Sequence, residues 1–260
     1  MLGLTNAQIK KVAPAAFAKQ PHERTSDKYV HVKTNKIIDD LKNLGWFPYS
    51  ATQSKVKKKE NDGTQTHMIR FRREADLDIK KTKDTVITEL LGVNGHDGRT
   101  RLQFYSGVFR MICGNGMIVM EQDFGGFNIK HIGYSFKDIE QLVINHVNGM
   151  SSVLDRISDY TSTKLTHEQK LILALRAHKA CQLSKNLEYA KLLTIRREED
   201  SRENLWSTFN IIQENIIKGG IKYFGNKRNT KSRKIESVRR GVNINLTLWG
   251  LLNNFYNEIS

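Results

Sequence analysis

The sequence predicts an α+β fold, with an antiparallel β-rich N-terminal half (residues 1–134) and a helical C-terminal half (135–260) packed against it. In the first half, apolar side chains alternate with a period of two, and Asp-Gly and Asn-Gly pairs mark hairpin turns. From Ser135 onward the apolar spacing is that of helices. No Pro-, Gly- or Ser-rich linker separates the halves, so they can also form one continuous domain.

The N-terminal half is expected to form sheet with a few short helices. Its expected elements are a short helix at 5–20 broken by Pro14, a strand at 29–32, a helix capped by Thr34 and ending at Gly45, and strands at 46–57, 66–73, 85–91, 101–112 and 117–124. The Asp-Gly pair at 62 and the Asn-Gly pair at 115 tolerate the positive φ of tight hairpin turns.

The C-terminal half carries clear helix start and stop signals. Ser135 with Asp138, and Thr166 with Gln169, have the spacing of N-terminal caps. The expected helices begin at these two caps, the second one running to about residue 183, and are followed by helices at 187–195 and 202–218 and by a final helix capped by Asn243 or Asn245. Two glycines after residue 218 end the fourth helix. The segment 222–240 lacks hydrophobic periodicity and is expected to be a flexible or β-like loop.

Positive charge is concentrated in two stretches. The 260 residues carry a net charge of +15. Residues 218–240 hold nine basic residues and one acid, and residues 53–83 hold ten basic residues and five acids, so 13 of the 15 net charges lie there. Such local excess indicates an anionic partner, most commonly nucleic acid, although two solvated loops that aid solubility would look the same.

The basic arm at 218–240 interleaves two aromatic residues with its cations. Aromatic rings can stack on bases while cations neutralise phosphates, although these rings could equally pack beneath the loop. We therefore expect contacts with nucleic acid, preferentially single-stranded DNA. The expected contact residues are Lys55, Lys57, Lys58, Lys59, Arg70 and Arg72 in the first stretch and Lys222, Tyr223, Phe224, Lys227, Arg228, Lys231, Arg233, Lys234, Arg239 and Arg240 in the arm.

Signals for enzyme chemistry are weak. The chain lacks a phosphate-binding loop, a dinucleotide fingerprint, a zinc-protease motif and a nucleophile elbow. His96 and Asp97, in a glycine-rich loop, are the weak catalytic candidates, because an imidazole beside a carboxylate can act as a base or bind a metal. The spacing of these residues and the other histidines (His31, His67 and His131) matches no common ligand pattern. We therefore expect no metal and no cofactor, and we favour a function other than catalysis.

Two further polar residues sit in or next to an apolar strand. Arg110 lies within the run Val108–Ile112 and needs a paired carboxylate, such as Glu89 or Asp97, or a bound anion. Asn115 is assigned to the same class, anion contact or structural residue.

The remaining composition indicates a cytoplasmic protein. Two distant cysteines, Cys113 and Cys181, cannot form a disulfide framework or a four-ligand zinc site. The chain has no run of 18 or more apolar residues and no secretory signal at its N-terminus, so no association with a membrane is expected.

Several runs together resemble the phage/plasmid-like protein family of unknown function that includes the YfjQ/YafZ-type prophage and plasmid proteins. These runs are Tyr29-x-x-x-x-Thr34, Gly45-Trp-Phe47, Gln53, His67-Met-x-Arg70-Phe-Arg72, Asn94-Gly-His-Asp-Gly98, Phe109-Arg-x-x-Cys-x-Asn-Gly116, Gln213-Glu-Asn, Gly219-Gly220 and Asn245-x-x-Leu-Trp249. The resemblance spans nearly the whole chain and implies a setting in mobile genetic elements without an assigned activity. The family loop usually reads Asn-Ser-His-Asp-Gly, and here Gly95 replaces the serine.

The first functional hypothesis is therefore a nucleic-acid-binding accessory protein of a phage, prophage or plasmid. The alternative is an interaction protein of a mobile element that inhibits a host factor, with the basic arm engaging an acidic protein surface. A second alternative is a metal-dependent enzyme that acts on nucleic acid through His96 and Asp97.

Overall fold

The computed structural model describes residues 3–56, 62–77, 85–110, 115–119, 127–129, 135–224 and 230–260. Contacts within the chain divide it into two compact units. The sheet unit comprises Met1–Met150 and Ser237–Arg239, and the helical unit comprises Ser151–Glu236 and Arg240–Ser260. The helix α3 (Phe136–Ser162) begins at the boundary expected from the sequence, and the division by contacts falls inside this helix.

The sheet unit is built on an antiparallel sheet, as predicted, that has six strands in the described part of the chain. The strands are β1 (Trp46–Gln53), β2 (His67–Arg73), β3 (Val86–Asn94), β4 (Leu102–Arg110), β5 (Asn115–Val119) and β6 (Phe127–Ile129). They are ordered β1-β2-β3-β4-β5, and β6 pairs with β4. The glycine expected to end the helix before β1 and the glycine expected in the hairpin turn before β2 are both confirmed, since Gly45 and Gly63 have positive φ.

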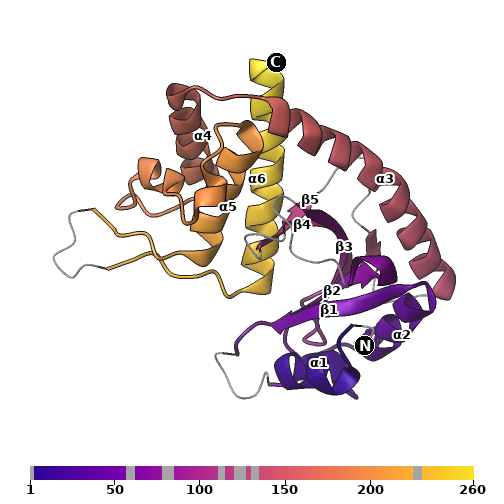
Figure 1. Ribbon diagram of the computed structural model, residues 1–260. Helices are drawn as coiled ribbons and strands as arrows, with labels where there is room; N and C mark the ends of the chain where they lie inside the picture. Colours follow the sequence, from indigo (N-terminus) through magenta and orange to yellow (C-terminus); the bar gives the residue numbers. More distant parts are fainter. Residues whose placement is uncertain are drawn as a thin grey trace. The chain divides into compact units, whose positions relative to one another are not determined.

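Short helices cover one face of this sheet. They are α1 (Asn6–Val12), a 3₁₀ turn η1 (Pro14–Phe17) and α2 (Thr34–Asn43), and a further 3₁₀ turn, η3 (Glu74–Asp76), follows β2. Figure 1 shows α1 and α2 beside β1. The core lies between the helices and the sheet, where Ile38 and Leu41 of α2 pack with Phe71, Leu90 and other buried apolar side chains of the strands. Burial of this apolar area is the main favourable contribution to the stability of the unit.

Three local predictions in this unit were wrong. The Asn-Gly pair at 115 forms no turn, since Asn115 and Gly116 are the first residues of β5 and pair with Arg110 and Phe109. Residues 29–32 form no strand, because their polar groups bond elsewhere: the Tyr29 N–H donates to the Ser26 carbonyl, and the Val32 carbonyl accepts from the Asn94 side chain. Thr34 is the first helical residue of α2 and not its cap, which is Lys33. The Thr34 hydroxyl is instead committed to buried partners described below.

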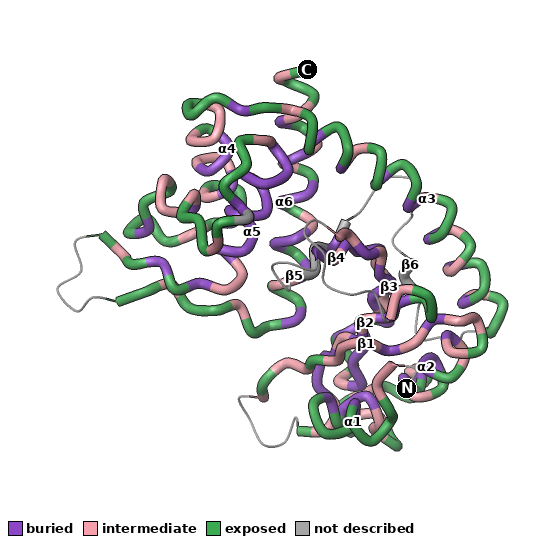
Figure 2. The backbone as a smooth tube through the Cα atoms, viewed as in Figure 1, coloured by how far each residue is buried: buried purple, intermediate pink, exposed green. Residues whose placement is uncertain are grey.

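The helical unit packs its helices around α5 (Leu205–Lys218). The other elements are the C-terminal part of α3, α4 (His167–Ala180), the 3₁₀ turns η5 (Tyr189–Leu193) and η6 (Glu198–Asp200), and α6 (Val238–Ile259). Every residue of α5 from Leu205 to Ile216 is buried, and Figure 2 shows the helix in purple along most of its length. The expected helical C-terminal half is confirmed.

The predicted caps were correct where they depend on neighbouring residues. The Thr166 and Gln169 side chains bond each other's backbone N–H groups, and Asp138 accepts from the N–H of Ser135. The predicted cap of the final helix was wrong. This helix begins at Val238, and Asn245 lies inside it, where its side-chain amide donates to the Gly241 carbonyl.

Among the residues that the structure describes, none of the helices combines the length and the apolar character needed to cross a bilayer.

Candidate nucleic-acid interface

Two of the three arginines of β2, Arg70 and Arg72, are ion-paired with Glu89 within the sheet unit. The side chain of Arg72 is 1% exposed; its Nε donates to Glu89 Oε1 at 2.7 Å, and its Nη2 lies 2.6 Å from the same oxygen in an ion pair. Arg70 Nη1 donates to the other carboxylate oxygen at 2.7 Å. The guanidinium carbon of Arg72 also lies 3.4 Å from the centre of the Tyr49 ring and 4.4 Å from that of Phe109, within cation–π range.

These contacts correct the sequence-based assignment of Arg70 and Arg72 to a nucleic-acid surface. The reason is Glu89 on the adjacent strand, whose carboxylate is fully buried and is balanced by the two guanidinium groups. A phosphate in solvent cannot reach Arg72 in this arrangement.

Arg110 is also an interior residue, with 3% of its surface exposed at the end of β4. The structure pairs it with Asn115, the first residue of β5, across the sheet. Of the two carboxylates expected beside Arg110, that of Glu89 accepts from the arginines of β2.

The glycine-rich loop after β3 directs His96 into the interior. The ring of His96 is fully buried, 4.5 Å from the ring of His31 and 5.3 Å from that of His67 between centroids. Thr34 Oγ1 lies 2.8 Å from His67 Nε2 and 3.4 Å from His96 Nε2, and it accepts from Asn94 Nδ2 at 3.0 Å. The runs Tyr29-x-x-x-x-Thr34, His67 and Asn94–Gly98, which are distant in sequence, therefore meet in one polar cluster.

Burial keeps an imidazole of this cluster neutral. Desolvation lowers the pKa of His67 to about 4, although its bond to the Gln65 carbonyl acts in the opposite direction. In the neutral ring, Nδ1–H donates to Gln65 and Nε2 accepts from the Thr34 hydroxyl. The Thr34 oxygen is then left to accept from Asn94, so the assignment satisfies all three groups.

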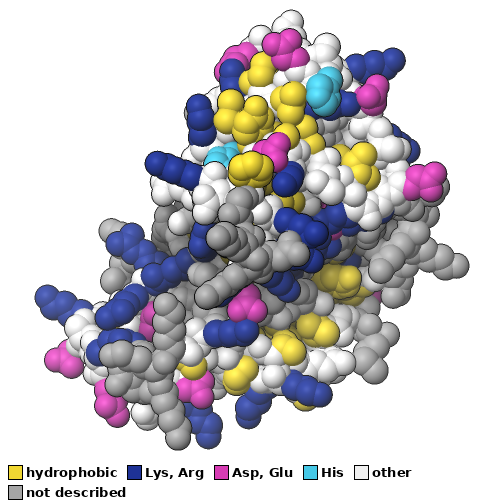
Figure 3. All heavy atoms as spheres, turned by 90° about the vertical axis from the view of Figure 1, so that its left-hand side faces the viewer, with side chains coloured by type: hydrophobic (Ala, Val, Ile, Leu, Met, Phe, Trp, Pro, Cys, Tyr) yellow, Lys and Arg dark blue, Asp and Glu magenta, His cyan; other side chains and the backbone are white. Residues whose placement is uncertain are grey.

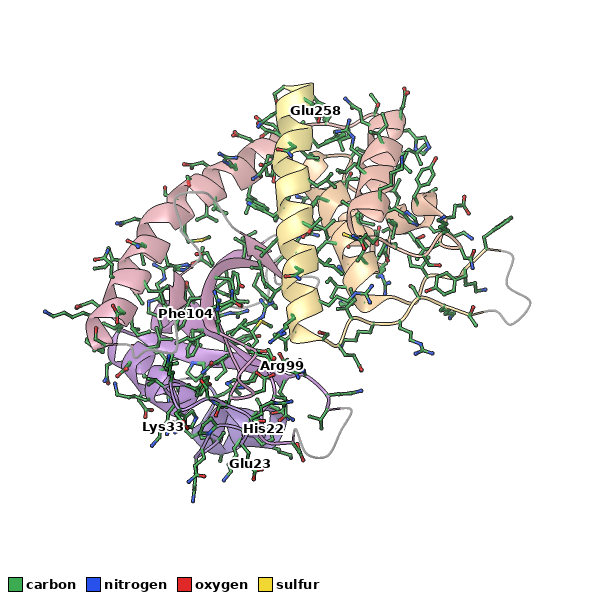
Figure 4. The ribbon with its side chains drawn as sticks, turned by 180° about the vertical axis from the view of Figure 1, so that it is seen from behind. His22, Glu23, Lys33, Arg99, Phe104 and Glu258 are labelled. Carbon is green, nitrogen blue, oxygen red and sulfur yellow. The ribbon has the colours of Figure 1, made fainter. Side chains whose placement is uncertain are left out.

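Asp97 accepts hydrogen bonds from the backbone of its own loop. One carboxylate oxygen accepts from the N–H groups of both Arg99 and Thr100, at 3.0 Å each. Burial and the charge of Asp97 raise the pKa of Tyr29 to about 12, and the Tyr29 hydroxyl donates to the Gly95 carbonyl. Figure 4 labels His22 and Arg99, which flank this loop; the His22 N–H donates to the His96 carbonyl at 2.8 Å.

The two weak catalytic candidates therefore have different surroundings: the ring of His96 is buried, and Asp97 caps a turn. In the described ranges, no group of three or more His, Cys, Asp or Glu side chains is arranged to hold a metal ion. Cys181 is a buried free thiol whose pKa burial raises to about 11, while Cys113 and His131 lie outside the described residues.

Close packing around Thr100 explains the glycine at position 95. A Cβ added to Gly95 would lie 2.7 Å from the Thr100 Cβ, a distance that real Cβ atoms do not show. Thr100 Oγ1 is 2.7 Å from the hydroxyl of Thr66 and accepts from Arg239 Nη2 at 2.6 Å. The serine usual in the resembled family would force Thr100 to move.

The contact with Arg239 shows where the two basic stretches meet. In the sheet unit, the Val238 N–H donates to Ser54 Oγ at 3.4 Å, and Ser54 precedes the exposed Lys55. The end of the arm therefore lies against the β1–β2 hairpin, the first basic stretch. Lys57, Lys58 and Lys59 lie outside the described residues.

In the helical unit the arm forms a short irregular hairpin. Residues 220–224 and 230–235 run side by side below α5 in Figure 1. The Tyr223 N–H donates to the Thr230 carbonyl and the Ser232 N–H to the Ile221 carbonyl, so that Lys222 stands opposite Lys231. Of the two expected forms, flexible or β-like, the structure shows the β-like one in these residues.

Two glycines attach this hairpin to the end of α5. Gly219 has a φ of +65°, and a Cβ there would lie 2.6 Å from the Arg233 carbonyl carbon. The Gly220 N–H donates to the Ser232 carbonyl, and at the other end of the hairpin the Ile235 N–H donates to the Ile217 carbonyl of α5. Only glycine fits at position 219 without displacing the returning strand.

A polar network around the buried Asn215 supports the same junction. Arg196 Nε donates to Asn215 Oδ1 at 2.7 Å, and its Nη2 donates to the Gly219 carbonyl. The Asn215 amide donates to the Leu192 and Thr194 carbonyls. Sequence reasoning recognised Gln213-Glu-Asn and Gly219-Gly220 as a motif but missed Arg196, because no local pattern identifies a partner 19 residues away.

The acid of this motif is compensated as well. Burial by itself raises the pKa of Glu214, but its bonds to Arg197 and Lys218 outweigh burial and hold the pKa below its usual value. The first residue of the arm, Lys218, is thus paired with a buried carboxylate.

Most other cations of the arm remain exposed. Exposed among the described residues are Lys222, Lys231, Arg233, Lys234, Arg239 and Arg240. Phe224 is 74% exposed, whereas Tyr223 is partly buried. Lys227 and Arg228 lie outside the described residues. On the face shown in Figure 3, Lys and Arg side chains are more frequent than Asp and Glu side chains.

The chain matches one known protein family over most of its length. The family model described as a domain of unknown function, DUF932, matches residues 21–254. This chain belongs to that family. The match includes most of both units and all the motif residues discussed above.

Two proteins of Escherichia coli (strain K12) are similar to this chain over nearly their whole length. The chain is 28% identical to the UPF0380 protein YafZ of Escherichia coli (strain K12) over 257 residues, which covers 95% of this chain and 89% of YafZ. It is 28% identical to the UPF0380 protein YfjQ of the same organism over 253 residues, with the same coverage. No solved structure matches. The resemblance to YfjQ/YafZ-type proteins is confirmed.

Proposed function

We propose that this protein binds nucleic acid, preferentially single-stranded DNA, as an accessory protein of a phage, prophage or plasmid. The observation that supports it best is the packing of the arm's end on the first basic stretch within the sheet unit. The Val238–Ser54 and Arg239–Thr100 bonds hold Arg239 beside the hairpin that carries Lys55. Cations gathered in this way raise the local potential that attracts phosphates.

The proposed contact set is the one expected from the sequence, without the two arginines that are paired with Glu89. It keeps Lys55 with Lys57, Lys58 and Lys59, and in the arm Lys222, Tyr223, Phe224, Lys227, Arg228, Lys231, Arg233, Lys234, Arg239 and Arg240. It omits Arg70 and Arg72, whose charges are balanced by Glu89.

A salt titration tests the proposal. A labelled oligonucleotide of about 20 nucleotides, single-stranded or duplex, is titrated with the full chain and followed by fluorescence anisotropy. If the contact set neutralises roughly six to ten phosphates, affinity for the duplex falls by about 10³ to 10⁵ between about 50 and 200 mM salt, and affinity for the single strand falls by less. The single strand is expected to bind more tightly than the duplex.

Matched variants locate the contacts. Lys55→Ala should lower the slope of log K against log salt by roughly 0.7 for a single strand. Lys10→Ala, which removes an exposed cation of α1 outside both basic stretches, should leave the slope unchanged. Absence of binding by the wild-type protein at low salt would end the proposal.

A further inference from the structure

The arm hairpin places two like charges directly opposite each other. The bonds from Tyr223 to Thr230 and from Ser232 to Ile221 flank the bridge between Lys222 and Lys231. This pattern makes the two lysines a non-hydrogen-bonded pair, the type in which facing Cα atoms are nearest, roughly 4.5 Å apart, and the side chains leave the same face.

Facing lysines destabilise a hairpin unless an anion lies between them. Both side chains are exposed, and neither forms an ion pair that the structure shows among the described residues. Two ammonium groups on one face can donate to two oxygens of a single phosphate, an arrangement that converts their repulsion into charge-assisted hydrogen bonds.

Alternation along this segment is expected to place Phe224, the turn residue at its end, on the same face as Lys222. Side chains of an extended segment alternate, so residues 222 and 224 point to one side. The backbone supports this geometry, because the Tyr223 N–H points to the partner segment while the Phe224 N–H points away from it, to the Asn186 carbonyl at 2.8 Å. The residue is 74% exposed; the next most exposed large hydrophobic residue of the described chain, Val12, reaches 51%.

The backbone beneath these three side chains is anchored at both ends. The Asn186 carbonyl holds Phe224, and the Gly219–Gly220 junction, supported by Arg196, holds the start of the hairpin. An aromatic ring presented from an anchored backbone loses little conformational freedom when it binds, because only its side-chain torsions are ordered.

We propose that Lys222, Lys231 and Phe224 form a subsite for one nucleotide of single-stranded DNA. The phosphate lies between the two ammonium groups, and the base stacks on the Phe224 ring. The inference rests on the proposed function and deepens it, since it assigns the preference for single strands to one residue. In a duplex both faces of each base are covered by neighbouring pairs, so the ring finds no partner there.

The experiment compares variants on three probes: a labelled thymidine oligonucleotide, a strand of the same length without bases, and a duplex. Phe224→Ala should weaken binding of the thymidine strand by roughly 5- to 150-fold, the range for loss of one stacked base. Binding of the baseless strand and of the duplex should not change. Phe224→Trp should restore binding of the thymidine strand, because a larger ring also stacks.

The lysines are expected to respond differently. Lys222→Ala and Lys231→Ala should each lower the salt slope by roughly 0.7 on the baseless strand as well as on the thymidine strand. Phe136→Ala is the matched control, since it removes another exposed phenylalanine, on α3. It should leave all three affinities unchanged.

The outcomes separate the two proposals. If the wild-type protein binds the thymidine strand and Phe224→Ala binds it equally well, the subsite is refuted while nucleic-acid binding stands. Equal weakening on the baseless strand would also refute it, because the ring would then act without a base. If the wild-type protein binds none of the probes at low salt, both proposals fail.

Discussion

The interior of the sheet unit and the arm of the helical unit both carry paired cations on strand-like segments, and the two regions treat them differently. Arg70 and Arg72 sit two residues apart on β2 and are balanced by the buried carboxylate of Glu89. Lys222 and Lys231 face each other on the arm hairpin and remain exposed. A basic residue paired with a buried acid on the neighbouring strand is therefore a poor candidate for a binding surface, whereas an exposed basic residue remains a candidate.

The same contrast extends to the polar residues of the family motifs. His67, His96 and Asn94 are buried in the sheet unit and bond one another through Thr34. The motif residues of the helical unit hold the start of the arm at the end of α5. The motifs thus describe the framework, and the exposed arm carries the chemistry that we propose.

Acid is expected to act most strongly on the buried region. Burial lowers the pKa of both His67 and His146, a buried residue of α3, to about 4, against about 6.5 in an unfolded chain. The unfolded state therefore binds more protons between these values, so the free energy of unfolding is highest above pH 6.5 and falls toward pH 4. The loss amounts to about 5 kcal/mol for the two histidines together at pH 4.5.

Urea unfolding at pH 7 and at pH 4.5 measures this loss. His146→Gln removes one titrating group and should reduce the pH dependence by about half, whatever the stability of the variant at pH 7. An unfolding free energy that stays constant over this range would show that the buried imidazoles do not behave as described.

Removing the acid of the buried region should leave its arginines unbalanced and destabilise the protein. Glu89→Gln takes away the carboxylate that offsets the charge of Arg72, which is 1% exposed. We expect a loss of about 3 to 5 kcal/mol in the free energy of unfolding, measured with urea at pH 7. Glu74→Gln, at an exposed position of η3, is the control and should change it by less than about 0.5 kcal/mol. A Glu89→Gln variant as stable as the control would mean that Arg72 is compensated by other groups.

A smaller effect is expected where the arm joins α5. Gly219→Ala places a methyl group 2.6 Å from the Arg233 carbonyl carbon at a φ of +65°. The resulting strain should cost about 1 to 3 kcal/mol of unfolding free energy. Gly241→Ala, inside α6 with no atom within 4 Å of the new Cβ, should be neutral or stabilising by up to about 1 kcal/mol. Equal behaviour of the two variants in urea unfolding would contradict the described junction.

The sequence predicted features that depend on near neighbours. The Ser135–Asp138 and Thr166–Gln169 caps and the stop at Gly219 each involve residues a few positions apart, and all three were correct. The fold class was also predicted, because the hydrophobic period is a local property.

Features that depend on distant partners were not predicted. Residues 29–32 have a strand-like pattern, yet the Val32 carbonyl is taken by Asn94, 62 residues away. The interior position of Arg72 depends on Glu89, and the helical start at Val238 lies in a basic segment without an apolar pattern of its own. In the candidate site, the cations of the arm and those at Arg70 and Arg72 of β2 look alike in the sequence. Only the structure distinguishes them, because most of the described arm cations are exposed and the two arginines are paired with Glu89.

The contact between Gly95 and Thr100 has a consequence for the evolution of the family. A serine at position 95 and a threonine at position 100 are mutually exclusive on this backbone, since the added Cβ would meet the threonine at 2.7 Å. Members with Asn-Ser-His-Asp-Gly should therefore carry glycine, which lacks the Cβ, at the position of Thr100. Because Thr100 also accepts from Arg239, the same exchange should relax selection for arginine there, which links a loop after β3 to the end of a segment about 140 residues further along the chain.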